Sequence, residues 1–295
     1  MKKLVALFMA MTMMCSFAAC GSKDTADTNT NGTNEPATEA VVEDDTEEAA
    51  PTETETVAES DLEYVKGKGT LVVGITDFAP MDYKDAEGNW IGFDADMAKA
   101  FAASLGVEVE FVEIDWGSKI LELDAKSIDC VWNGMTLTDE VKSAMSCSNA
   151  YCNNAQIVVL PADKLEQYPT VESLAELTFA VETGSAGEAE ALNLGFNTVA
   201  LETQANALME VKAGSSDAAI IDSLMAAAMV GEGTDYDVLA YNNELKLNSE
   251  EYGVGFRQGS DLTAALNDFF AAAYADGSMM TCAETYGVQA AIIAQ

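Results

Sequence analysis

The sequence predicts an α/β fold with two lobes, because apolar runs and helix-like segments alternate along the chain. Short apolar runs rich in β-branched residues, typical of buried strands, alternate with amphipathic segments from about residue 70 onward. The series is interrupted near Pro161 and then repeats the layout of the first half. With 295 residues, 49% of them hydrophobic, the chain is long enough for two cores. We therefore expect two lobes built on parallel-type sheets with helices on both faces.

The individual elements follow from local patterns. A strand is expected at 70–75, and a helix at 91–105, where Met97, Phe101 and Leu105 recur four residues apart and Gly106 can end the helix. Further strands are expected at 107–114, 178–181, 198–201, 217–221, 236–240 and 252–256, and further helices at 119–125, 171–177, from 188, and at 204–213, 224–230, 262–275 and 279–286.

The last two helices follow the last strand and have no sheet of their own, so we expect them to cover the first lobe. The chain would then cross between the lobes twice, near 158–161 and 248–252. This predicts a first lobe of residues 65–157 plus 250–295, and a second lobe of residues 158–249.

The N-terminal region has the pattern of an export signal and a tether. Residues 1–20 combine two lysines with a short apolar run, and the small residues before Cys20 resemble the lipobox of bacterial lipoproteins. We expect lipid on Cys20, or alternatively a plain signal peptide cut nearby. Residues 21–64 are acidic and nearly free of large apolar side chains, which predicts a disordered linker.

Composition excludes several kinds of function. A net charge of -36 argues against binding to nucleic acid. The absence of histidine excludes a Ser-His-Asp triad, a Cys-His pair and histidine-ligated metal. With no Cys-x-x-Cys pair either, we expect no metal and no cofactor. Cys130 should be a buried thiol, whereas Cys147 and Cys152 can either bridge or stay free.

One stretch, 127–138, has the features of a strand that ends in a binding loop. Asn133, Gly134 and Thr136 would place an amide, a bare backbone and a hydroxyl at the carboxyl end of a buried strand, where open α/β sheets bind ligands. The alternative is an ordinary strand-to-helix loop that caps the following helix.

Four motifs together resemble the family 3 extracellular solute-binding proteins, over about residues 66–287. They are Gly92-Phe93-Asp94-Ala95-Asp96-Met97, Ile128-Asp129 with Gly134-Met135-Thr136-Leu137-Thr138, Ser148-Asn149-Ala150-Tyr151 and Asp217-Ala-Ala-Ile-Ile-Asp222. The resemblance implies a type II periplasmic-binding-protein-like fold with a ligand cleft between its lobes. It also implies a monomeric, lipid-anchored receptor on the extracellular face of the membrane, which passes an amino acid or related amine to the permease of an ABC importer.

The resemblance also assigns binding roles to particular residues. Phe78 would contact the ligand side chain, or else anchor a loop. Asn133, Gly134 and Thr136 would meet the ligand with backbone and hydroxyl groups. Ser185 would receive a carboxylate at a helix N-terminus, or act only as an N-cap. Asp222 would receive the ligand ammonium, or cap the following helix.

One departure from the family pattern concerns the ligand carboxylate. The family usually carries an arginine where this sequence has Val141, in Thr138-Asp139-Glu140-Val141. Lys142 is adjacent but would point elsewhere on a helix, and Arg257 appears in a segment typical of a surface turn. The ligand should therefore keep a cationic group, with its carboxylate either absent or held near Ser185 with help from Lys142.

Other side chains leave alternatives open. Trp116 and Trp132 could form aromatic walls of the cleft or belong to the core, and a set of acids could make the cleft anionic or remain solvated: Asp77, Asp82, Glu113 and Asp115. A second class of function is an enzyme such as an amino-acid-like dehydratase on the same fold, with Glu113 or Glu182 as acid or base.

Overall fold

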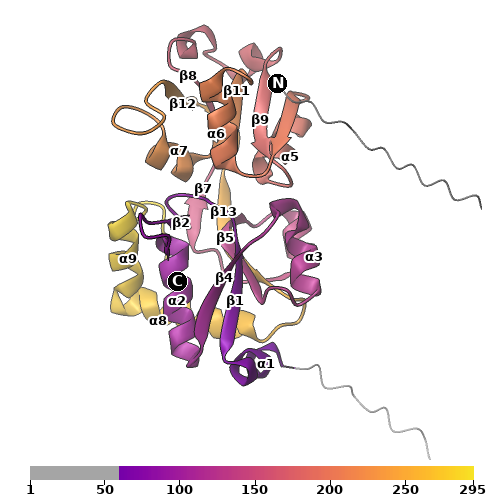
Figure 1. Cartoon of the computed structure of the whole chain (residues 1–295), viewed down its shortest axis with the longest axis vertical. Coiled ribbons are helices and arrows are strands. Elements are labelled where there is room, and N and C mark those ends of the chain that lie inside the picture. The colour runs from indigo at the N-terminus through magenta and orange to yellow at the C-terminus, as the bar shows by residue number, and fades with distance from the viewer. Residues whose placement is uncertain (1–59) are drawn as a thin grey trace, which may run out of the picture. The chain divides into compact units, whose positions relative to one another are not determined.

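Two separate β-sheets organise residues 60–295, the part of the chain that the computed structural model describes (Figure 1). The first sheet has the strand order β4-β1-β5-β13-β6, with β7 paired to β13, and the second has the order β10-β9-β11-β8-β12. The strands of the first sheet are β1 (Thr70–Ile75), β4 (Glu108–Glu113), β5 (Cys130–Thr136), β6 (Ser146–Cys147), β7 (Cys152–Asn154) and β13 (Glu250–Phe256). Those of the second are β8 (Gln156–Pro161), β9 (Thr178–Glu182), β10 (Asn197–Leu201), β11 (Ala218–Asp222) and β12 (Leu239–Lys246). A small hairpin pairs β2 (Tyr83–Lys84) with β3 (Trp90–Ile91).

Helices cover both sheets, as the alternating pattern predicts. They are α1 (Asp61–Lys68), α2 (Phe93–Leu105), α3 (Lys119–Asp124), α4 (Asp139–Ala144), α5 (Ala186–Asn193), α6 (Gln204–Ala213), α7 (Ser223–Met229), α8 (Leu262–Asp276) and α9 (Ser278–Tyr286). Short 3-10 turns lie at η1 (Trp116–Ser118), η2 (Leu165–Gln167) and η3 (Val171–Leu174). Both α8 and α9 pack against α2, beside the first sheet. Helix α2 ends where Gly106 adopts a left-handed conformation with φ of 75°.

The sheets are mixed and not parallel throughout. Strands β1, β4 and β5 pair in parallel, as do β9, β10 and β11. Strand β13, however, enters the first sheet antiparallel to β5, and β8 lies antiparallel to β11. Strands β8 and β13 each follow a crossing between the lobes, and each pairs antiparallel with a strand of the sheet that it enters.

Some predicted boundaries move. The first crossing lies between β7 and β8, because Gln156 already pairs with Asp222 in the second sheet. The helix expected at 171–177 is only the 3-10 turn η3. Residues 61–64, assigned to the linker, belong to α1, which Ser60 caps by accepting a hydrogen bond from the N–H of Glu63 at 3.0 Å. The remaining linker, the signal segment and Cys20 lie outside the described residues.

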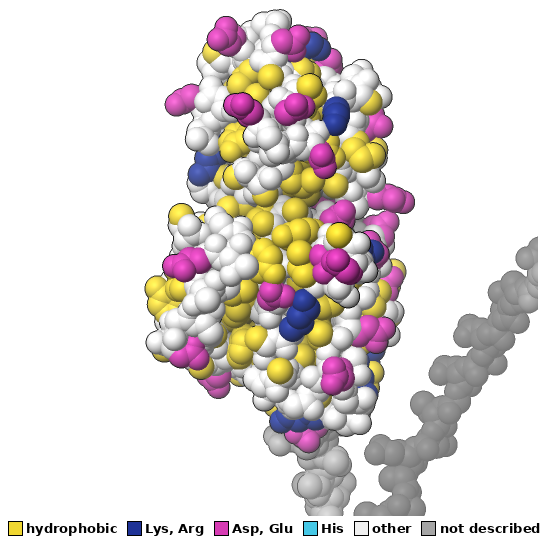
Figure 2. Space-filling view, turned by 60° about the vertical axis from the view of Figure 1, so that its left-hand side comes forward, with side chains coloured by type: hydrophobic (Ala, Val, Ile, Leu, Met, Phe, Trp, Pro, Cys, Tyr) yellow, Lys and Arg dark blue, Asp and Glu magenta, His cyan; other side chains and the backbone are white. Residues whose placement is uncertain are grey.

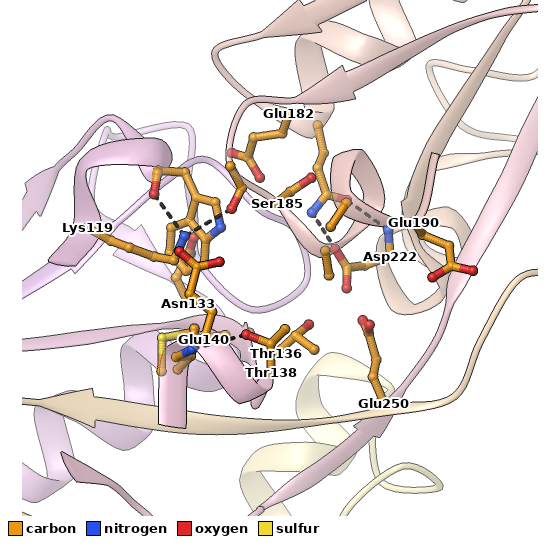
Figure 3. A pocket seen from close by; sticks show the side chains of 18 of the residues that line it. Lys119, Asn133, Thr136, Thr138, Glu140, Glu182, Ser185, Glu190, Asp222 and Glu250 are labelled. Atoms are coloured by element: carbon orange, nitrogen blue, oxygen red, sulfur yellow. Dashed lines mark hydrogen bonds between the residues drawn. The ribbon is translucent and has the colours of Figure 1, made fainter. Parts of the chain in front are cut away.

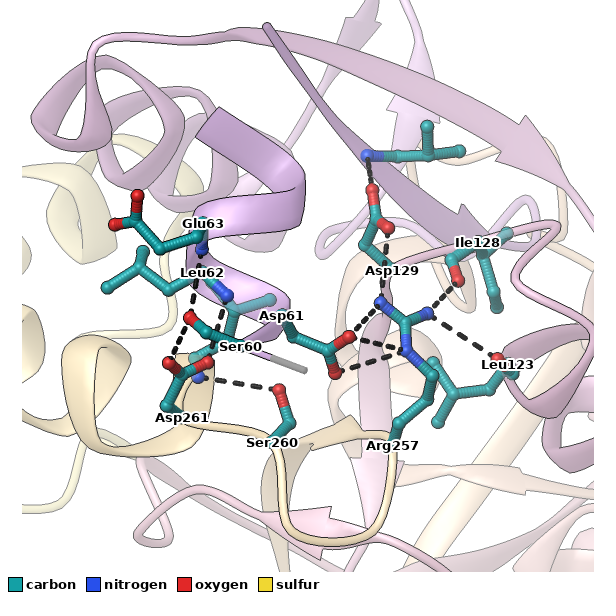
Figure 4. A network of polar contacts seen from close by, with 12 residues as sticks. Ser60, Asp61, Leu62, Glu63, Leu123, Ile128, Asp129, Arg257, Ser260 and Asp261 are labelled. Atoms are coloured by element: carbon teal, nitrogen blue, oxygen red, sulfur yellow. Dashed lines mark hydrogen bonds and ion pairs between the residues drawn. The ribbon is translucent and has the colours of Figure 1, made fainter. Parts of the chain in front are cut away.

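Helix α1 is held by a buried arginine (Figure 4). Arg257, expected in a surface turn, is only 9% exposed, and its Nε donates to both carboxylate oxygens of Asp61 at 3.0 and 3.1 Å. Its Nη2 lies 3.3 Å from Asp129, and its Nη1 donates to the carbonyl oxygen of Ile128 at 2.8 Å. The surface-turn interpretation is wrong because β13 places the Arg257 side chain among acceptors that are distant in sequence.

The four cysteines among the described residues, Cys130, Cys147, Cys152 and Cys282, are all free. Burial raises the pKa of the Cys130 thiol well above its usual value, in keeping with a packed neutral side chain. Acidic side chains outnumber basic ones on the face in Figure 2. None of the helices in residues 60–295 combines the length and apolar character needed to cross a membrane.

Candidate functional site

A cavity of about 400 Å³ is lined by residues of both lobes (Figure 3). The first lobe contributes residues of β5, α3 and α4, and the second contributes the ends of β9 and β11 with the start of α5. All six positions predicted to bind ligand line this cavity: Phe78, Asn133, Gly134, Thr136, Ser185 and Asp222. Their local contacts show which of them still have a free polar group.

The side-chain amide of Asn133 is hydrogen-bonded to other residues of the protein. Its Oδ1 accepts from the N–H of Thr76 at 3.0 Å and from the Thr76 hydroxyl at 2.8 Å. Its Nδ2 donates to the carbonyl oxygen of Thr76 at 3.1 Å and to Asp82 at 2.8 Å. Asn133 thus positions the segment that follows β1, and a ligand would have to displace one of these contacts to reach it.

Gly134 and Thr136 lie within β5 itself and not in a loop after it. The N–H of Gly134 donates to Asp94 at 2.7 Å, and Gly134 has a φ of 54°. A Cβ on this residue would lie 2.3 Å from Cε1 of Phe78, so the ring packs directly over the backbone. The Thr136 hydroxyl makes no hydrogen bond to another described residue and is half-exposed at the cavity wall.

We expect Gly134→Ala to lower the free energy of unfolding by about 2 kcal/mol. The left-handed backbone costs about 1 kcal/mol for a residue with a Cβ, and displacing the Phe78 ring adds at least about 1 kcal/mol. Urea unfolding measures the loss. Gly106→Ala is the matched control, because Gly106 has a φ of 75° but nothing within 4 Å of its Cβ position. Equal losses in the two variants would show that Phe78 does not require glycine at this position.

Ser185 is the N-cap of α5. Its Oγ accepts from the N–H of Glu188 at 3.1 Å. The Glu188 carboxylate in turn accepts from the N–H of Gly184 at 2.7 Å. A carboxylate of the protein itself therefore already occupies one donor at the start of this helix. The capping role considered for Ser185 is present, whereas its contact with a ligand stays a prediction.

Asp222 is buried at the end of β11 and is surrounded by donors. It accepts hydrogen bonds from the side chains of Asn154, Gln156, Gln204 and Tyr252, the last at 2.6 Å. Burial and then repulsion from Glu250 raise the pKa of Asp222 well above its usual value. No lysine or arginine among the described residues pairs with it.

Glu182, at the end of β9, is a second buried carboxyl in the cavity wall. It is 3% exposed, and its Oε1 has no hydrogen-bond partner among the described residues. Burial raises the pKa of Glu182 to about 8, although a hydrogen bond from Gln204 acts in the opposite direction. From the sequence, Glu182 was expected only as a catalytic acid or base.

Because the pKa of Glu182 is raised in the folded state, the ligand-free protein should lose stability as pH rises. Below the ordinary value of 4.5 the group is protonated in both states; between 4.5 and about 8 only the folded state keeps the proton. Each pH unit in that window costs about 1.4 kcal/mol, or about 2 kcal/mol from pH 6 to pH 7.5. Glu182→Gln should remove this component, which urea unfolding at the two pH values measures against wild type. An unchanged pH dependence would show that Glu182 is already ionised in the folded protein at pH 6.

Lys119 was not predicted from the sequence, yet it is the one basic residue among the described residues that line the cavity. Its Nζ donates to the carbonyl oxygen of Trp116 at 3.1 Å and to that of Gly184 at 3.0 Å. Trp116 belongs to the first lobe and Gly184 to the second, so Lys119 links the two lobes. Burial lowers the pKa of Lys119.

Val141, at the position where the family usually carries an arginine, lines the cavity as well. Val141 is 5% exposed and lines the wall, whereas Lys142 is exposed and lies outside the lining. The suggestion that Lys142 helps to hold a ligand carboxylate is therefore not supported by its position. Arg257 lies in the α1 network and does not line the cavity either.

The aromatic and acidic candidates separate into four environments. Trp116 lines the cavity, whereas Trp132 packs in the core against Phe101 and Phe270. Asp82 is fully buried beneath Asn133. The remaining acids, Asp77, Glu113 and Asp115, line a second cavity of about 580 Å³ together with Glu202.

Comparison with known proteins identifies the family. The model of the bacterial extracellular solute-binding proteins, family 3, matches residues 71–289. The chain belongs to this family. The arginine-binding extracellular protein ArtP of Bacillus subtilis is 31% identical over 208 residues, which cover 68% of this chain and 79% of that protein. The L-cystine-binding protein TcyJ of Escherichia coli is 29% identical over 230 residues, covering 76% and 85% of the two chains.

Solved structures of family members confirm the two-lobe type II fold. A crystal structure of a mutant of ArgBP from T. maritima has a TM-score of 0.72 and 32% identity, covering 77% of this chain and 99% of that one. A substrate-binding protein of an ABC uptake transporter from Streptococcus pneumoniae, with bound histidine, has a TM-score of 0.71 and 26% identity, covering 79% and 98%.

These relatives also decide between the two function classes. They are solute-binding proteins of transport, so this family member is not an enzyme. The dehydratase alternative has a counterpart in the ancestral amino acid-binding protein AncCDT-1, described as a precursor of cyclohexadienyl dehydratase, with 30% identity and a TM-score of 0.70.

Proposed function

We propose that this solute-binding protein captures an amino acid or related amine between its lobes and presents it to the permease of an ABC importer. The observation that carries the proposal is the buried carboxyl of Asp222, which lines the cavity and has no cationic partner among the described residues. A ligand ammonium would supply the missing charge, because a buried carboxylate is stable only when it is paired. Phe78 would cover the ligand from the first lobe, and Thr136 would offer its free hydroxyl.

The relatives support an amino-acid-like ligand, since their names state arginine, cystine and histidine as the molecules they bind. A thermal-shift screen of amino acids and amines tests the proposal. A ligand at 100 times its Kd should stabilise the protein by about 2.7 kcal/mol. Mass analysis of the protein after incubation should recover that ligand unchanged. If no amino acid or amine stabilises the protein, the proposed function is wrong.

We further propose that the protein acts as a monomer held at the extracellular membrane face by lipid on Cys20, with the acidic segment before α1 as its tether. The small residues before Cys20 and the apolar run that precedes them support this anchor. Mass spectrometry of membrane-extracted protein should show a lipid-modified N-terminal cysteine. Release of an unmodified chain into the medium would contradict the anchor.

A further inference from the structure

The carboxyl groups of Glu182, Asp222 and Glu250 form a row along one wall of the cavity (Figure 3). Gln204 hydrogen-bonds to Glu182 at one end and donates to Asp222 in the middle. Asn154 and Gln156 each donate both to Asp222 and to Glu250 at the other end, with bonds of 2.6 and 2.8 Å to Glu250. Neutral amides thus separate the acids, and no cation lies among them.

The rest of the cavity does little to neutralise this row. The other acidic lining residues are Asp139, Glu140 and Glu190, against Lys119 alone. Lys119 directs its Nζ at two carbonyl oxygens, and its charge acts on Glu182 alone among the three carboxyls, where it lowers the pKa. On one side the lining is the apolar Val141, and just before α5 the N–H of Gly184 already donates to the Glu188 carboxylate. The described lining therefore favours positive charge and offers little to a negative group.

We propose that the site takes an elongated organic amine with at least two cationic groups and no carboxylate, one cation at Asp222 and Glu250 and the other at Glu182. This inference rests on the proposed function and names its ligand class. The unpartnered Oε1 of Glu182 calls for a donor separate from the one at Asp222, because Gln204 already lies between the two carboxyls. A metal ion is a poor match, since no group of three or more acidic or cysteine side chains in residues 60–295 is arranged to hold one.

Binding of such a ligand should release protons. Glu182 faces Lys119, Asp115, Thr76 and Gln204, and in the empty protein its raised pKa of about 8 keeps it protonated at neutral pH. Asp222 faces Glu250, Tyr252 and Gln204, and its pKa is raised as well. A cation stabilises the ionised form of each group, so the affinity for a diamine should increase between pH 6 and pH 8.

Calorimetry on the purified full chain with matched ligands tests the proposal. The probes include two matched pairs, 1,4-diaminobutane with ornithine and agmatine with arginine. The members of each pair differ only by the α-carboxylate. The fifth probe, 1-aminobutane, carries a single cation. We expect at least one diamine to bind at least tenfold more tightly than its amino-acid counterpart and than 1-aminobutane, with net proton release in buffers of different ionisation enthalpy.

Glu182→Gln should remove most of the preference for the diamine over 1-aminobutane, and Glu250→Gln should weaken both ligands. Glu176→Gln is the matched control, because Glu176 is an exposed glutamate of the second lobe that does not line the cavity. It should change either affinity by less than threefold. Unfolding curves of each variant establish that it folds.

Two results overturn the inference while leaving the proposed function in place: an amino acid that binds as tightly as or more tightly than its decarboxylated partner, or a diamine preference that survives in folded Glu182→Gln. Failure of every amine and amino acid to bind would overturn both proposals.

Discussion

Replacing Asp222 with asparagine is expected to lower ligand affinity by about 100-fold or more. Asp222 can lose its proton when a cation binds, whereas asparagine cannot, so the ligand ammonium would be buried without its charge partner. Breaking a buried charged pair of this kind typically costs about 2–5 kcal/mol, and each 1.4 kcal/mol is a factor of ten in Kd. Calorimetry with the ligand found by the thermal-shift screen measures the loss.

Asp139→Asn is the control for Asp222→Asn. Asp139 lines the same cavity but is exposed at the start of α4, where solvent screens its charge. We expect its loss to change the affinity by less than about threefold. If both variants bind ligand alike, recognition does not depend on the buried carboxyl, and the ammonium role of Asp222 is wrong.

The strands and helices could be predicted from the sequence because most of them are specified locally. The apolar run of β1 is buried at four of its six residues and half-buried at the other two, as expected of a central strand, and Gly106 ends α2 where the periodicity stops. The antiparallel entry of β13 beside β5 could not be predicted, because no local pattern states the direction in which a returning strand runs. Helix α1 was missed for a similar reason: its buried anchor, Asp61, pairs with a residue near the other end of the chain.

The residues that line the cavity were predictable where a family motif or a strand end marked them. Asp222 stands at the end of an apolar run, and Gly134 begins the family motif Gly134-Met135-Thr136-Leu137-Thr138. Glu182 also ends an apolar strand, so the same signal was available for it, although it indicated catalysis as readily as binding. Gln204 and Glu250 begin a helix and a strand, where polar residues are ordinarily solvated. Packing of α6 against β11 brings Gln204 to Asp222, and Asn154 and Gln156 link Glu250 to the same carboxyl.

The chain contains a single arginine, and it does not line the cavity. Arg257 instead binds Asp61 at the start of α1 and Asp129 beside β5, in a setting where its side chain is 10% exposed. Asp129 is fully buried and also accepts from the N–H of Val72 at 2.8 Å and from Lys68 at 2.5 Å. Arg257 thereby ties α1 to the first sheet.

Arg257→Met is expected to lower the free energy of unfolding by about 3–5 kcal/mol, because it leaves Asp61 without its cation and Asp129 with Lys68 alone. The carbonyl oxygens of Leu123 and Ile128 also lose their donor.

Lys66→Met is the control on the same helix: Lys66 lies 3.9 Å from Glu63, and both side chains are exposed, at 42% and 75%. Such a surface pair contributes less than about 0.5 kcal/mol. Urea unfolding measures both variants, and Arg257→Lys separates charge from geometry, since lysine keeps the charge but cannot reproduce the paired contacts of the guanidinium. A loss in Arg257→Met no larger than that in Lys66→Met would mean that α1 is held by its apolar contacts and not by this network.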